Sequence, residues 1–69
     1  MNLDLKMVRA AVMKHRAVIG PPTAIHLHPA DVAGLAPEDH QFLTAGGGIV
    51  IESDVDVAEG AYSVGKGGL

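Results

Sequence analysis

The sequence predicts a small α+β domain with an N-terminal helix, a short strand, a short helix and a C-terminal β-hairpin that forms a small sheet. Three observations predict this class. Residues 3–18 repeat apolar side chains with helical spacing, residues 23–28 alternate as a half-buried strand does, and residues 49–57 hold two apolar segments separated by Ser53-Asp54. A chain of 69 residues has room for one small domain, which we place at residues 1–58.

The first predicted element is the helix at residues 3–18. Val8 and Val12 fall on one face of it, with other apolar side chains beside them. Asn2 is the expected N-cap. The Gly-Pro-Pro sequence at residues 20–22 ends the helix, because proline has no backbone N–H to donate.

A strand is predicted next, at residues 23–28, and a short helix directly after it. Ile25 and Leu27 lie on one side of this strand and His26 and His28 on the other. The sequence His28-Pro29-Ala30-Asp31 is typical of a helix start, because proline fits the first helical position and an acidic residue suits the first turn. A further helix start or a turn is predicted at residues 37–39.

The predicted hairpin occupies residues 49–57. A glycine run at residues 46–48 indicates a turn before the strand Ile49-Val50-Ile51, and Val55-Asp56-Val57 alternates as its antiparallel partner. Residues 59–69 are rich in glycine and nearly without large apolar side chains, so we expect a flexible tail there.

Composition excludes several classes of function. The chain has no cysteine and one residue each of tyrosine and phenylalanine, which removes disulfides, thiolate chemistry and base-stacking surfaces. Its net charge of −3 combines a basic first segment with an acidic remainder, so no nucleic-acid partner is expected. No apolar run is long enough to span a bilayer and no signal peptide is evident, so we expect no membrane insertion and a cytoplasmic location.

Two histidines are the candidate metal ligands. His26 and His28 lie two apart on a strand, so their imidazoles share a face and could bind one metal ion. No further ligand is fixed near them, so we expect no metal and no cofactor. Glu52, Asp54 and Asp56 are expected to form a solvated acidic face of the hairpin. No nucleophile or base stands in a catalytic context, so no enzymatic activity is expected.

Two segments, in the right order, carry a resemblance to a known family. Ile25-His26-Leu27-His28-Pro29-Ala30-Asp31 and Gly47-Gly48-Ile49-Val50-Ile51-Glu52-Ser53-Asp54 resemble the C-terminal domain of the FliH/HrpE/YscL family. The resemblance covers residues 5–58. It implies a homodimeric, non-enzymatic stator protein that binds the ATPase of a flagellar or type III secretion export apparatus.

The resemblance also implies roles for individual residues. His28, Pro29 and Asp31 would be structural, forming the strand exit and the capped helix start, and Gly47 and Gly48 would make the turn that lets the hairpin close. The partner surface would be the exposed apolar part of the first helix, which we place at Met7, Val8, Ala11 and Val12.

Two alternatives remain open. One is a small metal- or ligand-binding module built on His26, His28 and Asp31. The other is a free-standing homo-oligomer in which the first helix pairs with its copy.

Overall fold

The computed structural model describes residues 3–44 and 47–66, and these form helices on a small mixed sheet. This arrangement confirms the predicted α+β class. The elements, in chain order, are α1 (Leu5–Val18), β1 (Ala24–Leu27), α2 (Pro29–Ala33), α3 (Pro37–Leu43), β2 (Val50–Ser53) and β3 (Tyr62–Gly65).

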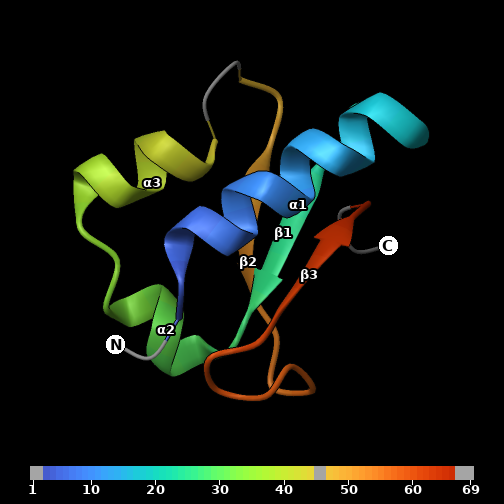
Figure 1. Cartoon of the computed structure of the whole chain (residues 1–69). Helices are drawn as coiled ribbons and strands as arrows, with labels where there is room; N and C mark the ends of the chain where they lie inside the picture. The colour runs from blue at the N-terminus through green and yellow to red at the C-terminus, as the bar shows by residue number, and fades with distance from the viewer. Residues whose placement is uncertain (1–2, 45–46, 67–69) are drawn as a thin grey trace.

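Strand β1 is the centre of the sheet, whose strand order is β2-β1-β3 (Figure 1). Strand β2 runs parallel to β1 and pairs Ile51 with Ile25, whereas β3 runs antiparallel and pairs Val64 with the same residue. A parallel pair needs a crossover connection, and α2 and α3 supply it.

The helices pack on one face of this sheet. Val8 and Val12 of α1, Leu43 of α3, and Ile25 and Leu27 of β1 have no exposed surface and share one hydrophobic cluster. Val32 of α2 packs against the same cluster. Residues that alternate with Ile25 and Leu27 therefore lie on the other face, where His26 stands beside Glu52 and Ser63 in the register.

Helix α1 begins two residues later than the predicted cap implies. Its N-cap is Asp4, whose carboxylate accepts hydrogen bonds from the backbone N–H groups of Lys6 at 3.0 Å and Met7 at 3.3 Å. The prediction that Asn2 caps the helix is therefore wrong, and Asn2 itself lies outside the described residues. A carboxylate at this position also interacts favourably with the positive end of the helix dipole, which favours Asp4 as the cap.

The predicted hairpin is wrong. Strand β2 pairs with β1 in parallel, and residues 55–57 form a turn instead of a second hairpin arm. Asp54 explains the turn, because its Oδ1 accepts the backbone N–H of Asp56 at 2.9 Å and its carbonyl accepts that of Val57 at 3.1 Å. These local bonds bend the chain away from β2, as aspartate commonly does in turns.

The predicted flexible tail is wrong for part of its length. Residues 62–65 form β3, which pairs with the edge of β1 that β2 leaves free. Residues 67–69 lie outside the described residues. Tyr62 and Val64 alternate with Ser63 and Gly65 and pack against the core. The alternation was hidden by the glycines around it, which lower the average hydrophobicity of the segment.

Candidate functional site

A groove with a volume of about 310 Å³ lies between α1 and β3. Val8 and Val12 pack α1 against the sheet. The neighbouring side chains of the helix therefore lie above the edge strand β3. A second hollow, of about 370 Å³, shares Ala11 and Lys14 and extends along α1 past Met7. The groove is lined by Ala11, Lys14, His15, Val18, Ile19, Tyr62 and Val64.

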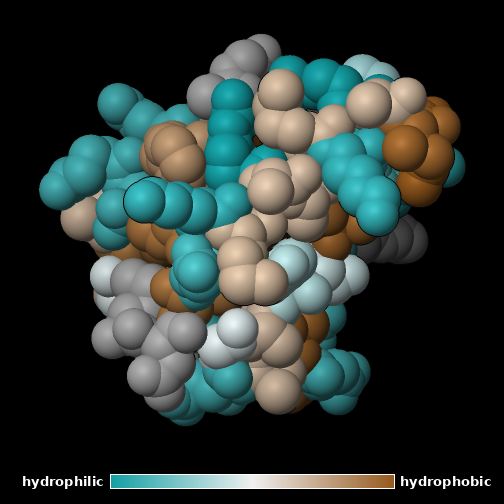
Figure 2. Space-filling model, viewed as in Figure 1, coloured by the Kyte–Doolittle hydropathy of each residue, from teal (hydrophilic) through white to brown (hydrophobic). Residues whose placement is uncertain are grey.

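The C-terminal end of α1 exposes large apolar side chains beside this groove. Val18 is 74% exposed and Ile19, the C-cap residue, is 75% exposed. Figure 2 shows hydrophobic atoms gathered over this end of the helix. Single exposed apolar residues are ordinary on protein surfaces, but a contiguous group that borders a groove is typical of an interaction site.

The rim of the groove is positively charged. Helix α1 contains two lysines and two arginines and no acidic residue. The guanidinium of Arg9 lies 6.0 Å from the ring centroid of Phe42 and is directed toward α3. Lys14 lines the groove itself. An approaching partner therefore meets an apolar hollow beside a lysine ammonium.

The four residues of the predicted partner surface differ in exposure. Val8 and Val12 are completely buried in the core, so neither can contact a partner. Both belong to the stripe that docks α1 on the sheet, which the sequence pattern alone did not separate from the stripe beside it. Met7 is 56% exposed and Ala11 lines the groove, so these two lie where a partner could reach them.

The predicted structural residues at the start of α2 do form a capped helix start. The Nδ1 atom of His28 accepts the backbone N–H of Ala30 at 3.0 Å, and Pro29 occupies the first turn. Asp31 is 3% exposed, and its Oδ2 accepts the backbone N–H of Gly60 at 2.7 Å. Because Gly60 lies just before β3, Asp31 ties α2 to the loop that leads into the last strand. The sequence alone did not predict this second contact.

Gly47 and Gly48 have φ angles of 75° and 76°, a region that other residues rarely adopt. They lie between α3 and β2, and the N–H of Gly47 donates to the carbonyl of Thr44 at 3.0 Å. Their expected role in closing a hairpin is therefore wrong, since no hairpin follows them. They instead turn the chain from the last helix of the crossover into β2.

His26 lies on the polar face of the sheet and contacts two elements distant in sequence. Its Nε2 lies 3.0 Å from the carbonyl oxygen of Lys66, which follows β3. Its Nδ1 lies 3.8 Å from Oε1 of Glu52 and 3.7 Å from Oδ2 of Asp54. If Nε2–H donates to the carbonyl, Nδ1 faces the two carboxylates, and these contacts are ion pairs when the ring is protonated.

The two candidate metal ligands, His26 and His28, make different contacts. His28 uses its Nδ1 to cap α2, whereas His26 faces Lys66 and the carboxylates of Glu52 and Asp54. Across residues 3–44 and 47–66 there is no group of three or more histidine, aspartate or glutamate side chains arranged to hold a metal ion. The expected acidic face is also divided, because Asp56 lies in the turn after β2.

Comparison with protein-family models, curated proteins and solved structures finds no match to this chain. Within the described part of the chain, no helix combines the length and apolarity that a membrane crossing needs. The resemblance to the FliH/HrpE/YscL family therefore stays a prediction from residues 25–31 and 47–54.

Proposed function

We propose that this chain is a non-enzymatic, cytoplasmic protein-binding domain that acts as a stator or regulator of the ATPase of a flagellar or type III export apparatus. The observation that carries the protein-binding part is the apolar groove between α1 and β3, with Val18 and Ile19 exposed at its end. The identity of the partner comes from the resemblance at residues 25–31 and 47–54.

The chemistry of the groove supports a protein partner. Its lining is mainly apolar side chains of α1 and β3, together with Lys14 and His15. Such a surface gains affinity by removing apolar area from water, while the lysine adds selectivity for an acidic neighbour.

The residues that carry the resemblance support a structural role for that motif. His28 caps α2 and Asp31 holds the loop before β3, so both side chains are engaged within the chain. A polar motif used in this way maintains the shape of the domain, and the contact surface is then formed by other residues. This division of roles suits a stator domain better than a catalytic one.

The proposal is tested by measuring binding of the full chain to the purified export ATPase of the same organism, by biolayer interferometry. Ile19→Asp places a charge beside the groove and is expected to weaken binding about tenfold or more. Val50→Asp is the matched control, because Val50 is 54% exposed and lies on β2, on the opposite side of β1 from the groove. Absence of binding by the unchanged chain, or equal loss in both variants, would refute the proposal.

A further inference from the structure

We propose that copies of this chain associate head to tail, with an acidic loop of one copy seated in the groove of the next. The acidic loop is residues 54–59, and the groove is the one between α1 and β3. This inference concerns the chain by itself and does not depend on the ATPase as a partner.

The acidic loop displays an apolar side chain between carboxylates. Val55 is 80% exposed and is flanked by Asp54 and Asp56, and Glu59 is exposed further along. The segment contains no basic residue. Asp54 fixes its shape by accepting the N–H groups of Asp56 and Val57, as described above. A loop already held in one shape loses less conformational entropy when it binds.

The groove offers the complementary chemistry. Val18 and Ile19 provide an apolar surface for Val55, and Lys14 provides a positive charge for Asp56. The two surfaces therefore match in both hydrophobicity and charge sign. Pairing of groove with groove is disfavoured, because it would bring the basic faces of two α1 helices together.

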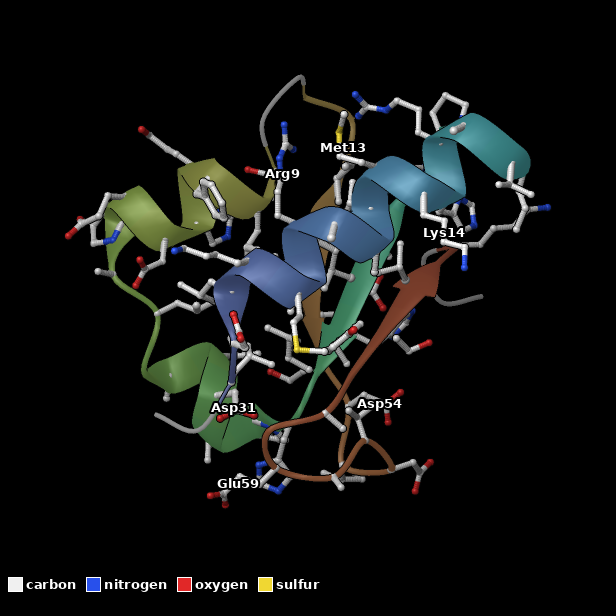
Figure 3. All side chains as sticks on the ribbon, viewed as in Figure 1. Arg9, Met13, Lys14, Asp31, Asp54 and Glu59 are labelled. Carbon is white, nitrogen blue, oxygen red and sulfur yellow. The ribbon has the colours of Figure 1, made fainter. Side chains whose placement is uncertain are left out.

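The two surfaces lie at different ends of the molecule. Figure 3 shows Lys14 at the end of the domain where α1 finishes, whereas Asp54 and Glu59 lie at the opposite end, with Asp31. None of residues 54–59 lines the groove of its own copy. One contact leaves a groove free on one copy and a loop free on the other, which is the geometry of a heterologous interface that grows into chains or rings.

The first test is the mass of the full chain by size-exclusion chromatography with light scattering, over about a hundredfold range of concentration. We expect the mass to rise with concentration and to fall when salt is raised, since the contact pairs opposite charges. A mass that stays monomeric across this range would overturn the proposal and would leave the groove to a different protein.

Two variants then identify the surfaces. Ile19→Asp damages the groove and Val55→Asp damages the loop, so each variant alone should remain monomeric. Mixed in equal amounts they should form a 1:1 heterodimer that grows no further, because an intact loop and an intact groove meet once. A Val55→Asp variant that still self-associates would overturn the proposal, because association would then not require the loop.

Charge reversal provides a second readout that does not depend on the apolar variants. Lys14→Glu and Asp56→Lys should each weaken self-association about tenfold, and the double variant should recover it, because the charges then match again in reverse. Circular dichroism of each variant verifies that the domain is folded. Failure of the double variant to recover association would contradict the assigned contact.

Discussion

The start of α2 and the groove beside α1 use their side chains in opposite ways. At α2 the polar side chains bond within the chain, since Asp31 is 3% exposed and accepts the N–H of Gly60, and His28 caps the helix. At the groove the apolar residues Val18 and Ile19 are directed outward. The difference indicates that in this small domain the polar motif maintains the fold, whereas aliphatic side chains form the surface that we propose as the contact site.

The largest effect should come from Asp31. Asp31→Ala leaves the N–H of Gly60 without its acceptor in a partly buried position, so we expect the free energy of unfolding to fall by about 2–3 kcal/mol. Urea denaturation followed by circular dichroism measures this loss. Asp31→Asn keeps an acceptor oxygen and should lose less. If both variants are as stable as the unchanged chain, Asp31 does not hold the last loop.

A smaller loss of stability should distinguish the buried face of α1, which contains Val12, from the exposed face, which contains Met7. Val12→Ala removes buried methyl groups from the core and should cost about 2 kcal/mol, whereas Met7→Ala changes a side chain that is half exposed and should cost less than about 0.5 kcal/mol. The same urea experiment compares them. Equal losses would mean that Met7 belongs to the core and not to the proposed contact surface.

The smallest of these effects should come from the cap of α2. His28→Ala removes the side chain that accepts the N–H of Ala30, and we expect a loss of about 1 kcal/mol in the free energy of unfolding. His28→Asn supplies another capping acceptor and should recover most of this loss. Thermal unfolding of the pair measures it, and a His28→Asn variant as weak as His28→Ala would show that the imidazole does more than cap the helix.

Elements defined by local pattern could be predicted from the sequence. Residues 3–18 show the apolar repeat that places Val8 and Val12 on the sheet, and Pro29 marks the start of α2 because its position needs no N–H. Strand β1 follows from its alternation. Each of these signals is contained within a few neighbouring residues.

Features that depend on pairing could not be predicted in the same way. The pattern of residues 50–53 predicts a strand but not whether it pairs in parallel or antiparallel. Its parallel pairing with β1 depends on the crossover through α2 and α3. The contacts of His26 with Glu52 and Asp54 follow from that register, so they were missed together with it. The exposed end of α1 was missed because periodicity identifies an apolar stripe but does not show where the sheet beneath it ends.

The position of β1 between two later strands has a consequence for how the chain folds. The contact of His26 with Lys66 joins residues 40 positions apart, so the sheet is completed by one of the most distant pairings in the described chain. Such non-local pairing slows folding relative to a helical protein of this size. During synthesis β1 has an unpaired edge until residues 62–65 emerge, and in that interval the edge is open to strands of other chains.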